Sequence, residues 1–309
     1  MLRAIHVEGS DVLDIKGLTK TYPNGVRALD GVDLTIGKGM YGLLGPNGAG
    51  KSSLMRTLAT LQSADKGSVT FDGIDLLKNP DPVRRMLGYL PQDFGVYPRI
   101  SAIKLLDHIA VLKGLSNAKE RKTIVEELLR QTNLWDVRKK APATYSGGMR
   151  QRFGIAQALL GDPKLIIVDE PTAGLDPEER NRFHNLLSEI GENVVVILST
   201  HIVEDVADLC ADMAIMHQGR IAMKGAPLDL VATVDGKIWR KVIEKSDLEA
   251  HQQRYKVVSA RLVQGRTVIR VYADGNPGDG FEAAAPNLED VYFSTIRGAI
   301  GSAAEREAA

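Results

Sequence analysis

The stretch YGLLGPNGAGKSSLMRTLATL, residues 41–61, joins an apolar run, a glycine-rich loop and an amphipathic segment in that order. YGLL is typical of a buried strand, and SLMRTLATL is typical of a helix. The loop between them fits the pattern G-x-x-x-x-G-K-[ST], in which backbone N–H groups at the start of a helix surround a phosphate. An ordinary glycine turn would not require Lys51. The stretch therefore predicts a strand, a phosphate-binding loop and a helix.

The loop supplies a set of candidate nucleotide-binding residues. We expect Lys51 to contact the β- and γ-phosphates, and the Ser52 hydroxyl to ligate magnesium. The predicted phosphate-binding residues are Asn47, Gly48, Ala49, Gly50, Lys51, Ser52 and Ser53.

Two further apolar runs are each followed directly by polar residues. LIIV at 165–168 precedes Asp169 and Glu170, and VVVIL at 194–198 ends three residues before His201. Uniformly aliphatic runs are typical of parallel strands covered on both faces, and ligands bind at the carboxyl ends of such strands. We predict that Asp169 holds magnesium through water and that Glu170 is the general base for an attacking water. For either residue alone, a solvated loop acid is the alternative.

The rest of the first 228 residues divides into a β-rich start and a helical insert. Val32, Leu34 and Ile36 alternate as in a half-buried strand, and the segment 11–18 is expected to pair beside it. From about 93 to 161 the pattern turns helical, with predicted helices in 103–115 and 123–134, so we expect an insert in the α/β core.

The character of the chain changes after about Leu230. The segment 259–272 predicts a hairpin that turns at Gln264-Gly265, and 287–296 predicts a short helix capped by Asn287. We therefore expect a main domain over 11–228 and a small accessory domain over 229–298. The segment 299–309 is expected to be a disordered tail.

Composition excludes several classes of protein. Lys plus Arg and Asp plus Glu both number 39, so no net charge favours a nucleic-acid partner, and none is expected. The single cysteine, Cys210, cannot form an internal disulfide, and no leader pattern precedes the first predicted strand. The longest aliphatic run, 194–198, is far shorter than the ~18 residues of a membrane helix. These features predict a cytoplasmic chain that does not itself cross a bilayer.

A phosphate loop by itself leaves GTPases, kinases, recombinases and transport ATPases as candidates. A GTPase is expected to carry an N-K-x-D string that recognises guanine, and the sequence has none. The other classes cannot be separated by this loop alone.

Four motifs in a fixed order carry a more specific signal. GPNGAGKSS (45–53), YSGGMRQRFGIAQALL (145–160), LIIVDEPTAGLD (165–176) and ILSTH (197–201) resemble the nucleotide-binding subunit of an ABC transporter over about residues 11–228. The resemblance implies an α/β fold with a P-loop NTPase core built on a mainly parallel sheet. It also implies an N-terminal antiparallel β subdomain, the helical insert and a small C-terminal α+β extension.

The same resemblance implies a role for the signature motif, the segment YSGGM at 145–149. It implies that this motif contacts the nucleotide bound to a second subunit. It implies that Ser146 and Gly148, with Gly147 between them, contact the γ-phosphate of ATP held by the partner, and that Asp176 crosses the dimer interface. A helix that simply needs a flexible entrance is the alternative. Tyr145 and Met149 replace the commoner leucine and glutamine, which is similar to the exporter branch that handles drugs, lipids and polysaccharides.

Three more residues receive roles by resemblance. His201 is similar to the switch histidine that contacts the γ-phosphate, and Gln92 is similar to the glutamine that reaches magnesium and senses the membrane partner. Tyr22 is similar to the aromatic residue that stacks on adenine. The alternatives are a structural histidine, a loop glutamine and a core or edge-strand tyrosine.

Together these features predict an ATPase that uses ATP and Mg²⁺. It is expected to dimerise with a second copy or a homologous ATPase subunit, and to drive a separate integral membrane permease, most simply an exporter, from the cytoplasmic face of the membrane. The apolar loop 94–100, with Phe94, Val96 and Tyr97, is the expected permease contact, and packing of these residues inside the insert is the alternative. Two other functions stay open: a non-transport regulator of a membrane partner, and a soluble ABC protein acting on the ribosome or DNA.

Overall fold

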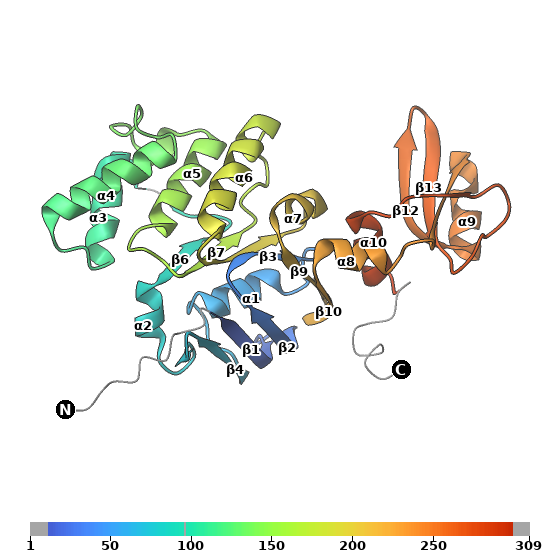
Figure 1. Ribbon diagram of the computed structural model, residues 1–309, viewed down its shortest axis with the longest axis horizontal. Coiled ribbons are helices and arrows are strands. Elements are labelled where there is room, and N and C mark those ends of the chain that lie inside the picture. Colours follow the sequence, from blue (N-terminus) through green and yellow to red (C-terminus); the bar gives the residue numbers. More distant parts are fainter. Residues whose placement is uncertain (1–11, 96, 299–309) are drawn as a thin grey trace.

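The computed structural model describes residues 12–95 and 97–298, and a six-stranded sheet lies at its centre (Figure 1). The strand order is β10-β9-β3-β8-β7-β6, in which β10 is antiparallel to β9 and the other neighbours are parallel. The strands are β3 (Gly39–Leu44), β6 (Leu87–Leu90), β7 (Leu165–Asp169), β8 (Val195–Thr200), β9 (Asp212–His217) and β10 (Arg220–Gly225). Every residue of β7 and β8 is buried, as their aliphatic sequences predicted.

A second, antiparallel sheet is formed by the N-terminal part of the chain. Its order is β2-β1-β4-β5, with β1 (Leu13–Thr21), β2 (Arg27–Ile36), β4 (Lys66–Phe71) and β5 (Ile74–Asp75). The predicted pairing of the first two strands is confirmed, because Leu13 lies opposite Ile36 and Ile15 lies opposite Leu34. Apolar side chains of this sheet pack with α1 (Lys51–Leu58) and one face of the central sheet into a single core.

The helical insert lies at one end of the molecule. It contains α3 (Ala102–Leu112), α4 (Ala118–Gln131) and α5 (Gly147–Ala158), and the short α2 (Pro80–Arg85) precedes β6. The predicted bounds of two helices were wrong. Helix α4 begins five residues earlier than 123 because Asn117 caps it by accepting from the N–H groups of Lys119 and Glu120. Helix α3 ends before Gly114, whose φ of 92° is incompatible with a continuing helix.

Helices α6 (Pro177–Gly191), α7 (Val203–Leu209), α8 (Pro227–Ala232) and α10 (Leu288–Ile296) share a second core with the central sheet. Phe183 of α6, Val206 of α7 and Val291 of α10 belong to the same apolar cluster as Leu198 of β8. The last helix in the described part of the chain, α10, is thus built into the core of the α/β unit.

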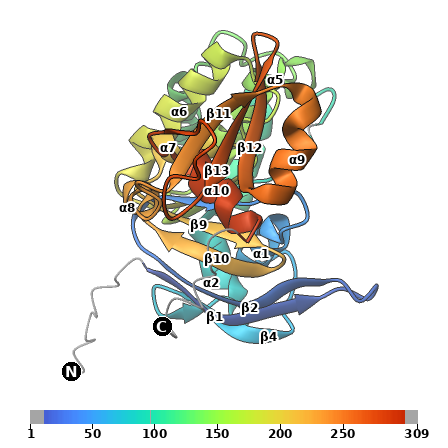
Figure 2. The same cartoon turned by 90° about the vertical axis from the view of Figure 1, so that its right-hand side faces the viewer.

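The C-terminal sheet stands at the end of the molecule opposite the insert (Figures 1 and 2). Its order is β12-β13-β11-β14, all antiparallel, with β11 (Ile238–Ile243), β12 (Lys256–Val263), β13 (Arg266–Tyr272) and β14 (Glu282–Ala283). Helix α9 (Leu248–Arg254) packs on it around Phe281. The predicted hairpin turn at Gln264-Gly265 is confirmed, with φ of 50° and 80° at its two residues.

Two predicted features of the chain's ends lie outside the described residues. These are residue 11, where we expected the main domain to begin, and the tail 299–309. The boundary between main and accessory domains near 228 stays a prediction.

Candidate active site

The loop between β3 and α1 is shaped by contacts of two of its glycines with the surrounding strands. A Cβ on Gly50, where φ is 108°, would lie 2.2 Å from the carbonyl oxygen of Ala28 in β2. A Cβ on Gly45 would lie 2.5 Å from the carbonyl oxygen of Met216 in β9. The packing therefore excludes side chains at both ends of the loop, and α1 begins without a capping side chain on its first N–H groups.

Lys51, the first residue of α1, turns its ammonium group back toward the loop. Its side chain is only 4% exposed, and Nζ donates to the carbonyl oxygen of Gly45 at 2.7 Å. The same Nζ lies 3.3 Å from Oε1 of Glu170. A phosphate in the loop would therefore meet a buried cation whose position is set by the loop itself.

Glu170 is the point at which the predicted catalytic residues meet. Its Oε2 accepts from Nε2 of Gln92 at 3.3 Å and lies 3.2 Å from Nδ1 of His201, while Oε1 contacts Lys51. Its backbone has φ of 48°, a strained conformation for a glutamate, and its N–H donates to the carbonyl oxygen of Ser199. The parallel sheet thus brings together side chains from four separate segments of the chain, at the carboxyl ends of its strands.

Asp169 lies beside Glu170 in a more buried environment. Its carboxylate accepts from the Ser199 hydroxyl at 2.7 Å and from Ser52. Burial raises the pKa of Asp169, the Ser199 hydrogen bond lowers it, and the charge of Glu170 adds to the increase.

The pair Ser52 and Asp169 fits the chemistry of magnesium, which prefers oxygen ligands and keeps several waters or phosphate oxygens. The described residues contain no group of three or more His, Cys, Asp or Glu side chains placed to hold a metal ion. An ion here would therefore take most of its ligands from water and from the nucleotide. Gln92 contacts Glu170 in the structure, and its expected magnesium contact stays a prediction.

A cleft of about 550 Å³ extends from the loop toward Tyr22. The Tyr22 hydroxyl lies 3.0 Å from the Ser53 hydroxyl and donates to Oε1 of Gln62 at 3.1 Å. These bonds hold the ring at one wall of the cleft, and its expected stacking on a base stays a prediction. The predicted residues that line the cleft are Tyr22, Asn47, Gly48, Ala49, Gly50, Lys51, Ser52, Ser53, Gln92 and Glu170.

Sequence reasoning missed two polar residues of the cleft, Arg27 and Gln218. Gln218 has φ of 49° in the turn between β9 and β10, and the pair Gln218-Gly219 is a recognisable turn signal. The turn could have been predicted, but no local pattern shows that it lies beside the phosphate loop.

Comparison with known proteins identifies the family. Residues 29–173 match the model of the family described as ABC transporter. The chain is 32% identical to the daunorubicin/doxorubicin resistance ATP-binding protein DrrA of Streptomyces peucetius, over 88% of this chain and 81% of the relative. The chain belongs to the ABC transporter family.

Two further similarities define the extent of the match. The chain is 32% identical to the probable multidrug ABC transporter ATP-binding protein YbhF of Escherichia coli over 93% of its own length, and it spans only 52% of that relative. The dimeric, post-hydrolysis ATP-binding cassette MJ0796, bound to ADP and Pi, matches 69% of this chain and 98% of its own, with a TM-score of 0.64 and 27% identity. The expected fold class is confirmed, and the core of the chain has the fold of an ATP-binding cassette.

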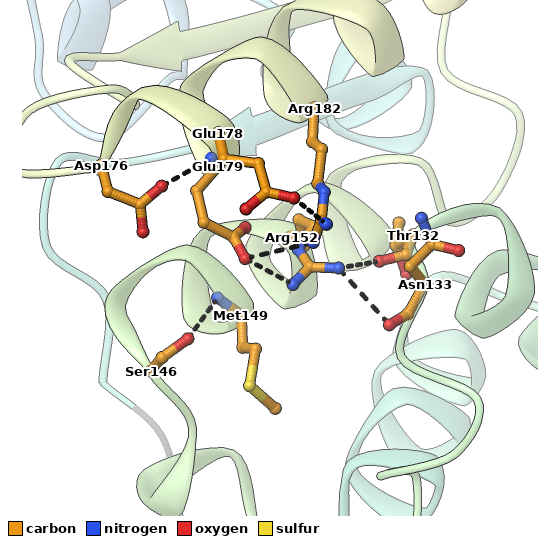
Figure 3. A network of polar contacts seen from close by, with 9 residues as sticks. All are labelled: Thr132, Asn133, Ser146, Met149, Arg152, Asp176, Glu178, Glu179 and Arg182. Atoms are coloured by element: carbon orange, nitrogen blue, oxygen red, sulfur yellow. Dashed lines mark hydrogen bonds and ion pairs between the residues drawn. The ribbon is translucent and has the colours of Figure 1, made fainter.

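The signature motif of this ABC cassette lies at the start of α5 (Figure 3). Ser146 caps the helix by accepting from the N–H of Met149 at 3.2 Å. Ser146 and Gly147 are exposed, whereas Gly148 is buried. The side chain of Glu179 packs against it so closely that a Cβ at this position would lie 2.6 Å from Oε2. Gly148 is thus required by packing within its own chain, and the expected contact of this motif with a second subunit's nucleotide stays a prediction.

Glu179 connects the signature helix with the segment after Asp176 (Figure 3). Asp176 caps α6 by accepting from the N–H of Glu179 at 2.8 Å, and Oε1 of Glu179 accepts from Arg152 of α5 at 3.2 Å. Asp176 therefore has a structural role in addition to its expected place at a dimer interface. A separate cavity of about 310 Å³ is lined by Gly147 together with Gln92 and Glu170.

The expected permease contact, 94–100, is only partly apolar surface. The ring of Phe94 packs against Gly154 of α5 and is half-buried, as the alternative predicted. Tyr97 is 60% exposed and Ile100 is 37% exposed, whereas Val96 lies outside the described residues. Tyr145 is buried, and its hydroxyl donates to the carbonyl oxygen of Val137 at 3.0 Å.

Proposed function

We propose that this chain binds and hydrolyses ATP with Mg²⁺ to power a separate membrane permease, and that the transport direction is export. The observation that carries the proposal is the convergence of Lys51, Gln92 and His201 on the carboxylate of Glu170, beside the phosphate loop. ATP hydrolysis requires a base within hydrogen-bond reach of the attacking water, close to the γ-phosphate. Glu170 is the carboxylate that meets this requirement.

In the proposed reaction, each residue has a distinct task. Lys51 binds the β- and γ-phosphates, and Glu170 accepts the proton of the attacking water. His201 and Gln92 orient the Glu170 carboxylate from two sides. A magnesium ion held by Ser52 and Asp169 would neutralise charge on the phosphates.

Export is supported by the relatives, which are named as drug-resistance and multidrug ATP-binding proteins. Among the described residues, no helix combines the length and apolar character needed to cross a membrane. We propose that integral membrane permease subunits are supplied by other chains, that Tyr97 and Ile100 contribute to the contact with them, and that this chain is peripheral at the cytoplasmic face. Identification of a multi-span partner in the purified membrane complex would test this part of the proposal.

The central test is Glu170→Gln, which preserves shape but removes the base. We expect ATP affinity within about threefold of the parent and a kcat lower by about 100-fold or more. Calorimetry measures binding, and phosphate release measures turnover. The matched control is Glu126→Gln in α4, whose carboxylate pairs only with Lys122 among the contacts of the structure. Turnover of Glu170→Gln at the parent rate would show that another group is the base.

A further inference from the structure

Asp205 of α7 has a fully buried carboxylate, with 0% exposure, that contacts four side chains. Its Oδ2 accepts from the Thr172 hydroxyl at 2.6 Å and from the Thr200 hydroxyl at 3.3 Å. Its Oδ1 accepts from Nε of Arg180 at 2.8 Å and lies 2.8 Å from Nε2 of His184. These partners come from the segment after β7, from the last residue of β8 and from α6.

The two threonines lie next to the proposed catalytic residues in sequence. Thr172 follows Glu170 by two positions, and Thr200 directly precedes His201. The Thr200 hydroxyl also accepts from the N–H of Ile202 at 3.0 Å, which closes the turn that carries His201. A single oxygen of Asp205 therefore links the segment after β7 to the end of β8, and the side chains of Glu170 and His201 carried there meet at 3.2 Å in the active site.

Contact with a ligand does not explain this carboxylate. The described residues that line the 550 Å³ cleft and the 310 Å³ cavity do not include Asp205. A buried carboxylate is costly unless it is paired and hydrogen-bonded, and here Arg180 supplies the charge while both hydroxyls supply bonds. An apolar residue would fill the space but would leave these donors without their acceptor.

We propose that Asp205 is a positioning residue for hydrolysis. It acts through Thr172 and Thr200 to hold the side chains of Glu170 and His201 in their positions relative to each other. This inference rests on the proposed ATPase function. Misplacement of a reacting group by about 1 Å can lower a rate by up to 100-fold, so a link of this kind affects turnover more than nucleotide binding.

The test removes one hydroxyl at a time with little change of shape. We expect Thr172→Val and Thr200→Val each to lower kcat by about tenfold with KM within about twofold of the parent. Thr172→Ser and Thr200→Ser keep the hydroxyl and should keep most of the activity. The control is Thr295→Val in α10, which removes a buried hydroxyl that donates to the carbonyl oxygen of Val291; Thr295 is not among the described residues that line the 550 Å³ cleft or the 310 Å³ cavity. Its kcat should equal that of the parent.

A double-mutant cycle with Asp205→Asn separates positioning from general stability. Because both threonines act through one carboxylate, Thr200→Val should lower kcat by less in the Asp205→Asn background than in the parent. Independent, multiplicative effects would overturn the inference. The serine and valine comparison decides the question by itself if Asp205→Asn does not fold.

The outcomes also separate this inference from the proposed function. An active parent whose Thr→Val variants lose melting temperature but keep kcat would show that Asp205 is structural only. A folded parent without any ATPase activity would overturn the proposed function and this inference with it.

Discussion

Gly147 and Gly148 are adjacent in the signature motif, yet they are glycines for different reasons. A Cβ on Gly147 would meet no atom within 4 Å, whereas a Cβ on Gly148 would lie 2.6 Å from Oε2 and 2.8 Å from Cδ of Glu179. The Glu179 side chain is held in this place because its other oxygen, Oε1, pairs with Arg152 of α5. The burial of Gly148 therefore depends on a contact between α5 and α6.

This difference predicts opposite effects on stability. Gly148→Ala should lower the free energy of unfolding by about 1–3 kcal/mol because it overpacks a close contact. Gly147→Ala should leave it unchanged or raise it by up to ~1 kcal/mol, because alanine favours helix. Urea denaturation followed by circular dichroism measures both. Equal effects of the two substitutions would contradict the packing explanation.

The buried carboxylate of Asp290 connects helix α10 to the C-terminal sheet. Asp290, 2% exposed, accepts the backbone N–H of Asn287 at 3.0 Å and so completes a capping box. The same carboxylate accepts two bonds of 2.7 Å from Nε and Nη2 of Arg270 in β13. Helix α10 also belongs to the same apolar core as α7 and α8. The ion pair of Asp290 with Arg270 therefore joins the C-terminal sheet to the α/β unit.

Breaking this connection should be costly. Asp290→Ala should lower the free energy of unfolding by about 3–5 kcal/mol, because it leaves a partly buried Arg270 without its carboxylate partner and removes half of the capping box. Asn287→Ala should cost about 1 kcal/mol. The neighbouring Glu289→Ala, whose ion pair with Arg261 is at the surface, should cost less than about 1 kcal/mol. Chemical denaturation gives all three values, and an Asp290 effect no larger than that of Glu289 would refute the assigned role.

The location of Ser146 bears on how two copies of the chain would cooperate. Ser146 is exposed at the start of α5, and the described residues that line the phosphate-loop cleft do not include it. If Ser146 serves the nucleotide of a second copy, each active site needs one intact loop and one intact signature from different chains. A similar cassette of known structure is a dimer.

A mixed dimer tests this arrangement. Homodimers of Lys51→Ala and of Ser146→Arg should each be inactive, since every site contains a defect. In the mixed dimer both defects fall in one site, and the other site is intact, so ATPase activity should return to as much as about half of the parent value if the sites act independently. Phosphate release from a tethered pair of the two variants measures this without partner exchange.

The control is a tethered pair of one unaltered chain and one Lys51→Ala/Ser146→Arg chain. Each of its sites contains one defect, so it should be inactive if the signature acts across the dimer. Activity in this control together with an inactive mixed pair would mean that the signature acts within its own chain.

Local features could be predicted because their conformations are encoded by neighbouring residues. The phosphate loop, the Gln264-Gly265 turn and the Asn287 cap each need particular backbone angles or a side chain within three residues of a free N–H. The aliphatic runs of β7 and β8 predicted buried parallel strands for the same reason. Successive residues of a strand point to opposite faces, so consecutive aliphatic residues indicate that both faces are covered.

Contacts between distant segments were decided by the order of strands and the packing of helices. Gln92 meets Glu170 across 78 positions, Gly148 is buried by Glu179 of another helix, and Arg27 and Gln218 line the cleft without any local signal. The carboxylate of Asp205 has the same origin, because its partners become neighbours only when β7 and β8 pair side by side. Periodicity and turn residues specify backbone conformation over a few residues, whereas which side chains meet depends on how the finished elements pack, and that packing is a property of the whole chain.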